Sequence, residues 1–186
     1  ERERYKIPYG ATISVREGQP YTVTAVRLEG NYLGRDEDFK RIVSIKPGDP
    51  YRSADVAATS KSFGDLFGQF GYAFARTEAR PEIDRAAGQV VVVLNADPQR
   101  RVYVRRINVA GNDRTRDEVV RREFRQLESA WYDGERIKLS RDRVDRLGFF
   151  KEVNVETEEV PNSADQVDLV VKVVEKPTGN LLVGAG

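Results

Sequence analysis

The chain carries one sequence pattern twice. Residues 26–31, VRLEGN, return 81 positions later as residues 107–112, INVAGN. Further along, residues 70–72, FGY, correspond to residues 147–149, LGF, at an offset of 77. The four residues lost between the two offsets fall within a predicted helix, where four residues are close to one turn and their loss keeps the apolar stripe on one side. The chain is therefore predicted to hold two copies of one small module, an arrangement that favours a binding or scaffolding role over catalysis.

The residue types that most enzymes and metal sites use are missing. The 186 residues include no Cys, no His and no Met. Without Cys there is no disulfide scaffold and no thiolate metal site, and without His the commonest general base and metal ligand is lost. Carboxylates such as those of residues 36–38 and 158–159 lie at predicted helix starts and strand ends, where the helix dipole and solvent account for them. We therefore expect no catalytic site, no bound metal and no cofactor.

Charge is distributed unevenly along the chain. The net charge is +1, but residues 99–125 carry 9 basic and 4 acidic groups. This stretch either faces an acidic partner or lipid phosphates, or forms a solvated face with local ion pairs, and the solvated face is the favoured interpretation. Neither an initiator Met, nor a signal peptide, nor an apolar run of membrane-spanning length is present, so we expect a piece of a longer protein.

Hydrophobic periodicity predicts the same element order in both copies. Two helices lie between the first and second strand of each copy, and the predicted strands cover residues 21–28, 72–80 and 89–96, then 102–109, 150–158 and 166–174. If consecutive elements alternate in direction, strand three becomes central, parallel to strand one and antiparallel to strand two. The predicted fold class is α+β, with tandem β-α-α-β-β modules that each form a three-stranded mixed sheet with two helices on one face.

Caps and spacing predict the helix boundaries. In the first copy the short helix is expected over residues 35–43, and Ser53 is expected to cap the longer helix. In the second copy residues 115–118, TRDE, are typical of a capping box, and Asp133 is expected to cap the second helix. The apolar stripe of the long helix is predicted to consist of Val56, Ser60, Phe63, Phe67 and Phe70.

The repeat divides the chain into four parts. They are an unassigned N-terminus and the tail of a preceding module with its last strand at 12–16 (residues 1–20), two modules (21–98 and 99–177), and the start of a further strand (178–186). Because only a few residues separate the two modules, the joint is expected to be stiff. Gly64 and Gly68 lie inside the long helix at a cost in helix propensity, which indicates close packing against a neighbour.

The second strand of each module is predicted to lie at an edge of its sheet and to present unpaired backbone groups. In the first module alanines give one face of this strand only small side chains, so an extended peptide could add as a further strand. The alternative is a guarded edge, because Arg76, Glu78 and Arg80 are typical blockers of unwanted pairing. The predicted peptide-binding residues are Tyr72, Ala73, Phe74, Ala75, Arg76, Thr77 and Glu78.

The order and spacing of several motifs resemble POTRA (polypeptide-transport-associated) domains. The motifs are Gly-Asn turns after the first strands, PGDPY before the second helix, LGFF after it, and a closing Val-rich strand. Residues 121–131, 146–150 and 161–167 closely resemble the last POTRA module of the BamA family of outer-membrane β-barrel assembly factors. The resemblance covers residues 11–186 and implies that the two modules are the fourth and fifth POTRA modules, with a barrel beginning at residues 178–186.

The resemblance also implies a location, a function and partners. The chain is expected in the periplasm of a Gram-negative bacterium, with its parent protein anchored in the outer membrane by a C-terminal barrel. It is expected to be a non-enzymatic scaffold that binds a BamD-like lipoprotein, other assembly-complex lipoproteins and unfolded outer-membrane proteins.

In this family the last POTRA module docks BamD through the matching region, which implies a partner-binding site at Glu128, Arg121, Arg122, Arg125 and Trp131. Two alternatives stay open for these residues. Glu128 is otherwise an ordinary solvated acid, and Trp131 is either an exposed anchor or buried beneath the turn of the first helix.

Three other functions fit the sequence less well. A POTRA region of a two-partner secretion or translocation pore would resemble residues 121–131 less closely, and a structural module of a periplasmic or division complex is the next alternative. The β-α-α-β order also opens a KH domain, which clamps nucleic acid with a Gly-x-x-Gly loop between its helices. Here that spacing occurs only at residues 68–71, at the end of the second helix, so no nucleic-acid partner is expected.

Overall fold

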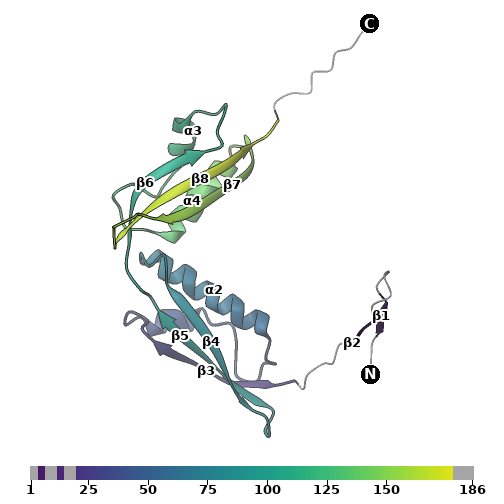
Figure 1. Ribbon diagram of the computed structural model, residues 1–186. Helices are drawn as coiled ribbons and strands as arrows, with labels where there is room; N and C mark the ends of the chain where they lie inside the picture. Colours follow the sequence, from purple (N-terminus) through teal and green to yellow (C-terminus); the bar gives the residue numbers. More distant parts are fainter. Residues whose placement is uncertain (1–3, 7–11, 15–19, 178–186) are drawn as a thin grey trace.

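Two α+β modules follow one another in the computed structural model, which describes residues 4–6, 12–14 and 20–177 (Figure 1). The first module contains, in order, β3 (Thr22–Gly30), α1 (Asp36–Arg41), α2 (Ser53–Gln69), β4 (Arg76–Asp84) and β5 (Gln89–Asp97). The second contains β6 (Tyr103–Ala110), α3 (Asp117–Arg121), α4 (Gly134–Asp145), β7 (Phe150–Glu159) and β8 (Gln166–Glu175). Both modules therefore have the predicted β-α-α-β-β order.

The third strand of each module is central in its sheet. The strand orders are β3-β5-β4 and β6-β8-β7. The central strand is parallel to the first strand and antiparallel to the second in both sheets. This is the predicted topology, and it leaves the first and second strands of each module as edges.

The first module is built around an aromatic core. The ring of Phe39 in α1 lies 5.1 Å from that of Phe63 and 4.5 Å from that of Phe67, both in α2. Tyr32 completes the cluster and donates a hydrogen bond from its hydroxyl to the carbonyl oxygen of Leu94 at 2.7 Å. Burial raises the pKa of this hydroxyl well above its ordinary value. Because α1 and α2 contribute to one cluster, both helices cover the same face of the sheet.

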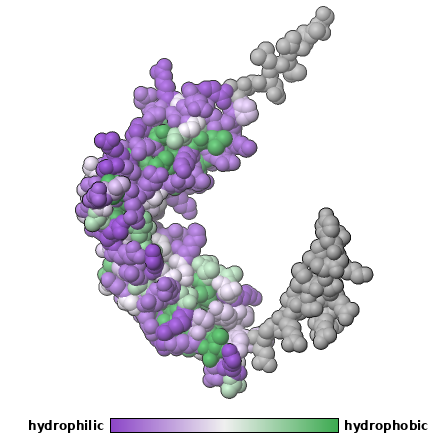
Figure 2. Space-filling model, in the orientation of Figure 1, coloured by the Kyte–Doolittle hydropathy of each residue, from purple (hydrophilic) through white to green (hydrophobic). Residues whose placement is uncertain are grey.

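The second module has a mainly aliphatic core. Val120 of α3 and Val144 of α4 belong to one buried cluster with Val104, Leu169 and Val171 of the sheet. Both helices therefore cover one face here as well, as the sequence predicted. Outside the two cores, Figure 2 shows a surface of mainly hydrophilic side chains, on which hydrophobic ones gather in small separate patches.

Two predicted helix caps are wrong and one is confirmed. The residue before α2 is Arg52, and neither Ser53 nor any other side chain caps this helix. The residue before α3 is Arg116, with no side-chain cap, and the backbone N–H of Thr115 donates instead to the carboxylate of Glu175 at 2.7 Å. Asp133 does cap α4, since its carboxylate accepts from the N–H groups of Glu135 and Arg136 at 3.0 and 3.1 Å.

The buried stripe of α2 also differs at one position. Thr59, rather than Ser60, faces the core between Val56 and Phe63. Its hydroxyl donates to the carbonyl oxygen of Asp55 at 2.8 Å, so the polar group is satisfied within the helix and can be buried.

The ends of the chain are described only in part. The short strands β1 (Arg4–Lys6) and β2 (Thr12–Ser14) pair antiparallel. The assignment of residues 1–20 to a preceding module stays a prediction, and the predicted strand at 178–186 lies outside the described residues. Within the described ranges, no helix combines the length and apolar character needed to cross a membrane, and no group of acidic residues is arranged to hold a metal ion.

Candidate partner-binding surfaces

The two modules meet where the end of α2 contacts the start of α4. A Cβ atom at Gly68 would lie 3.7 Å from Cε1 of Tyr132 and 3.9 Å from Cα of Gly134, so the two helices approach closely through glycine. Gly68 therefore fulfils the prediction of close packing. Gly64 does not, because a Cβ atom there would meet nothing within 4 Å.

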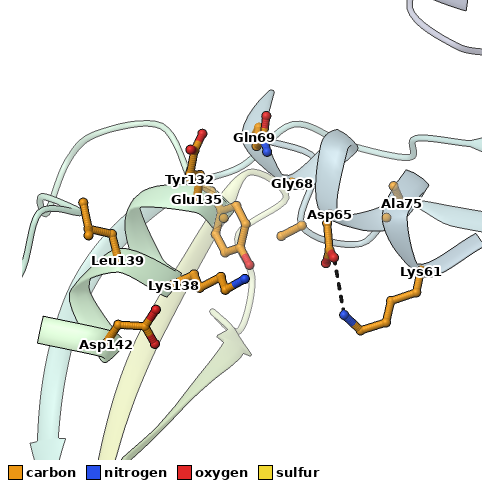
Figure 3. A pocket seen from close by; sticks show the side chains of 13 residues that line it. Lys61, Asp65, Gly68, Gln69, Ala75, Tyr132, Glu135, Lys138, Leu139 and Asp142 are labelled. Atoms are coloured by element: carbon orange, nitrogen blue, oxygen red, sulfur yellow. Dashed lines mark hydrogen bonds and ion pairs between the residues drawn. The ribbon is translucent and has the colours of Figure 1, made fainter. Parts of the chain in front are cut away.

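A cavity of about 710 Å³ opens beside this contact. Figure 3 shows the ring of Tyr132 and the side chain of Lys138 pointing into the space between α2 and α4. Lys61 and Asp65 form an exposed ion pair of 3.4 Å on the α2 side. Burial raises the pKa of Tyr132. The cavity beside the joint is thus polar, with the ring of Tyr132 in its wall, and residues of both modules line it.

The turn after α2 corrects the predicted peptide-binding strand. Tyr72, Ala73, Phe74 and Ala75 are not in a strand, and β4 begins only at Arg76. The chain leaves α2 through Gly71, whose φ is +95°, and the N–H of Tyr72 returns to the carbonyl oxygen of Phe67 at 3.1 Å. These backbone groups end the helix and are not available for a strand ladder.

The side chains of this turn help to build the joint. Ala73 and Phe74 pack against the core of the second module, whereas Tyr72 and Ala75 pack against the first. The guanidinium of Arg100 lies 4.9 Å from the ring centroid of Phe74. The joint is therefore a packed contact to which two of the seven predicted peptide-binding residues, Ala73 and Phe74, contribute across the modules.

Arg76, Thr77 and Glu78 do lie on the edge strand β4, which runs on to Asp84. Nearly every residue of this strand is exposed. Arg80 and Glu82 belong to an ion-pair network that crosses the sheet to β3, with Arg27 to Glu82 at 2.9 Å and Arg80 to Glu29 at 3.5 Å. Such charges, together with Pro81, are typical of a strand that remains at an edge.

A second surface gathers three residues from the end of α3 and the loop after it. The carboxylate of Glu128 accepts a hydrogen bond from the N–H of Ile107 at 2.8 Å and lies 3.5 Å from the guanidinium of Arg121. Leu127 is 61% exposed beside them. A hollow of about 380 Å³ lies among these residues, Phe124 and Gln126. We call Arg121, Leu127 and Glu128 the loop surface.

The other predicted partner-binding residues are not part of the loop surface. Arg122 pairs with Glu123 at 3.6 Å. Arg125 donates to the carbonyl oxygens of Arg122 and Phe124, both at 3.1 Å, so its guanidinium turns back onto its own loop.

Trp131 is exposed and lies beside the linker between the modules. It is 51% exposed, and the guanidinium of Arg101 lies 4.3 Å from its ring centroid. Its ring meets that of Tyr103 edge to face at 6.0 Å. Burial of Trp131 beneath the first-helix turn is therefore wrong, and its role as an anchor for a partner stays a prediction.

The residue that sequence reasoning missed is Gln126. It is buried, its amide nitrogen donates to the carbonyl oxygens of Leu127 and Trp131 at 3.0 and 3.1 Å, and its amide oxygen accepts from the N–H of Asp133 at 2.9 Å. One side chain thus bonds to the backbone on both sides of Glu128 in this loop. The offset of 81 aligns Gln126 with buried Ile45, a signal of burial that the repeat did contain.

Comparison with known proteins identifies the modules. Residues 21–99 and 102–176 each match the family model POTRA, described as a surface antigen variable number repeat. The chain belongs to the POTRA family. The predicted POTRA fold of both modules is thereby confirmed.

These POTRA domains are homologous to those of BamA and match its POTRA4–5 region best. The outer membrane protein assembly factor BamA of Neisseria meningitidis serogroup B is 35% identical over 176 residues, which is 94% of this chain and 22% of that protein. The chain thus spans about a fifth of the length of the curated relatives it matches.

Two crystal structures show the same arrangement of modules. Haemophilus influenzae BamA POTRA3–5 has a TM-score of 0.83 and 29% identity, covering 94% of this chain and 71% of that one. BamA from Haemophilus ducreyi lacking POTRA domains 1–3 has a TM-score of 0.72 and 30% identity, covering 86% of this chain and 30% of that one.

Proposed function

We propose that this chain is the periplasmic POTRA region of an outer-membrane β-barrel assembly factor, and that it scaffolds assembly without catalysing a reaction. The observation that carries the proposal is the homology of both modules, in the same order, to the POTRA region of BamA. The packed joint supports a scaffolding role, because it holds the edge strands and loops of the two modules in a defined relative position.

The loop surface supports docking of a BamD-like lipoprotein. Leu127 is the most exposed large apolar side chain of the described residues, and it lies beside the charged pair of Arg121 and Glu128. Exposed apolar side chains next to charges that become desolvated on binding are typical of interface centres. A basic group of the lipoprotein would pair with Glu128 and displace Arg121, whose contact with Glu128 is solvent-exposed and weak.

Capture of the purified BamD homologue of the same bacterium by this chain tests the docking proposal. Glu128→Gln keeps an oxygen that can accept from Ile107 but removes the charge, so it should weaken capture about tenfold without unfolding the module. Leu127→Ser should act in the same direction. Arg125→Ala is the matched control, because this guanidinium donates to the carbonyl oxygens of Arg122 and Phe124 and is not part of the loop surface. Capture that is unchanged in both loop-surface variants would reject the proposed site.

Unfolded outer-membrane proteins are proposed to pair with the edge strand β4 (Arg76–Asp84). This strand is exposed and has no neighbour beyond it in the described sheet. An NMR titration with a peptide from a barrel strand should shift amide signals along Arg76–Asp84, except at Pro81, which has no amide hydrogen. Shifts that are confined to α1 and α2 would contradict strand addition.

A further inference from the structure

The groove at the loop surface occurs once in each module. In the second module it is the hollow between β6 and the loop after α3. The first module has a hollow of about 310 Å³ at the corresponding place, lined by Ala25, Val26, Leu28, Lys40, Val43, Ile45 and Pro47. The repeat offset of 81 aligns Ile107 with Val26, Arg121 with Lys40 and Glu128 with Pro47.

The backbone of the two grooves is the same. In each module the first strand has a register shift, between Val23 and Ala25 in β3 and between Val104 and Arg106 in β6. Just before the shift, the strand forms a backbone hydrogen bond to the loop. The N–H of Val23 donates to the carbonyl oxygen of Asp49 at 2.8 Å, and the N–H of Val104 donates to the carbonyl oxygen of Ala130 at 2.9 Å.

The loops themselves also correspond. Ser129 has a φ of +61° and donates its N–H to the carbonyl oxygen of Val104 at 2.7 Å. Gly48, at the equivalent position, has a φ of +96° and donates to Val23 at 2.8 Å. A side chain at position 47 therefore projects from the same turn as the side chain of Glu128.

The two grooves differ in the side chain that occupies them. In the second module the Glu128 carboxylate binds the edge N–H of Ile107 and faces Arg121. In the first module the register places the N–H of Val26 at the same outer edge of the strand, but Pro47 brings no acceptor to it. The walls are apolar, and Lys40 is the one charged residue among those that line this groove.

We propose that the groove of the first module binds an acidic residue of a partner polypeptide, an Asp or Glu flanked by apolar residues. Its carboxylate takes the place that Glu128 fills in the second module, accepting from the N–H of Val26 and pairing with Lys40. The flanking apolar side chains lie on Leu28 and Val43. Lys40 now pairs with Glu37 at 2.8 Å, but both side chains are largely exposed, so this pair is weak and can be exchanged.

The duplicated module argues for this occupant over a basic or a purely apolar one. A cation would meet Lys40 and an N–H donor, which both repel it. An apolar segment would bury the N–H of Val26 without an acceptor, and a buried unpaired donor is costly. Only an acceptor with negative charge satisfies both groups, as Glu128 does for Ile107 and Arg121. The site is separate from the loop surface and from β4, so it is tested independently of both.

The test is an NMR titration of the whole chain with the peptide acetyl-Val-Leu-Glu-Leu-Val-amide and with the same peptide carrying Gln in place of Glu. The largest amide shifts are expected at Val26 and Val43, and the Gln peptide should bind at least about fivefold more weakly, because a charge-assisted hydrogen bond and an ion pair are lost. Equal binding of the two peptides, or shifts only at β4 or the loop surface, would overturn the proposal.

Pro47→Glu provides the decisive variant. The new carboxylate should close the groove from within, slow the hydrogen exchange of the Val26 amide about tenfold and abolish peptide binding. Pro47→Gln is the matched control for loss of the proline ring and should retain most of the binding. Lys40→Gln should weaken the Glu peptide but not the Gln peptide. Peptide binding that survives Pro47→Glu unchanged would show that the groove is not the site.

Discussion

The carboxylate of Glu128 accepts a hydrogen bond from the backbone N–H of Ile107 at 2.8 Å, so a loop side chain satisfies the edge of strand β6 just beyond its register shift. The same carboxylate faces Arg121 at 3.5 Å and is 46% exposed. One side chain therefore has a structural contact and remains accessible to a partner. The two roles can be separated, because amide exchange reports the contact with Ile107 and capture reports the accessible charge.

Glu128→Ala is predicted to destabilise the second module by about 1.5–3 kcal/mol, since the N–H of Ile107 loses a charged acceptor. Its amide should exchange faster in the variant, whereas Glu128→Gln should keep most of the protection. Urea unfolding and NMR hydrogen exchange measure both effects. Glu158→Ala, on the exposed side of β7, is the control with little change expected. Unaltered Ile107 exchange in Glu128→Ala would show that the bond does not protect the edge.

The topology was predictable because it depends on periodic patterns. Strands of alternating or continuous apolar residues and helices with an apolar stripe are visible in each copy. Because both copies show the same pattern at corresponding positions, each supports the assignment made in the other. The contact between Glu128 and Ile107 was not predictable, since it joins a side chain to a backbone group across a register shift and leaves no periodic signal.

The joint shows a second limit of sequence reasoning. Ala73 and Phe74 have the alternation of a strand, yet they belong to the turn and pack against the other module. Their surroundings are set by tertiary contacts that local propensity does not contain. The burial of Gln126 was predictable only in part. Its alignment with buried Ile45 indicated burial, whereas its polar residue type did not.

Ser129→Gly is predicted to stabilise the second module by about 1 kcal/mol. Ser129 has a φ of +61°, a conformation that costs a side-chain-bearing residue about 1–2 kcal/mol, and its own side chain is exposed. The equivalent residue of the first module is already Gly48, at a φ of +96°. The converse change, Gly48→Ser, should therefore destabilise the first module. Thermal unfolding of both variants tests the pair, and a loss of stability in Ser129→Gly would contradict the strain argument.

Glu175 is predicted to make the second module sensitive to acid. Burial alone would raise its pKa, but hydrogen bonds from Thr115 and Arg114 outweigh this and lower the pKa from 4.5 to about 2. Because the folded pKa is below the unfolded one, the stabilisation is fully present above pH 4.5 and is lost as the pH falls towards 2. Urea unfolding at pH 7, 5 and 3 should show this loss.

Glu175→Gln should reduce stability at pH 7 and flatten the decline between pH 5 and pH 3. Glu158→Gln, at an exposed position of β7, should leave the wild-type pH profile unchanged. A Glu175→Gln profile that is as steep as the wild type would mean that other carboxylates cause the acid sensitivity.

The contact at Gly68 is predicted to set the angle between the modules. A leucine there must enter the space occupied by Tyr132, since even a Cβ atom lies 3.7 Å from its ring. Gly68→Leu should therefore separate α2 from α4, while Gly68→Ala, with only ordinary contacts, should keep the angle and add about 1 kcal/mol through helix propensity.

Spin labels on Lys61→Cys and Lys138→Cys measure this angle, because the chain has no other cysteine and both positions border the cavity between the modules. Pulsed electron paramagnetic resonance should give a longer, broader distance distribution for Gly68→Leu. Gly64→Leu, one turn earlier and with open space around its Cβ, is the matched control and should keep the wild-type distribution. If Gly68→Leu also gives the wild-type distribution, the close approach at Gly68 does not set the angle between the modules.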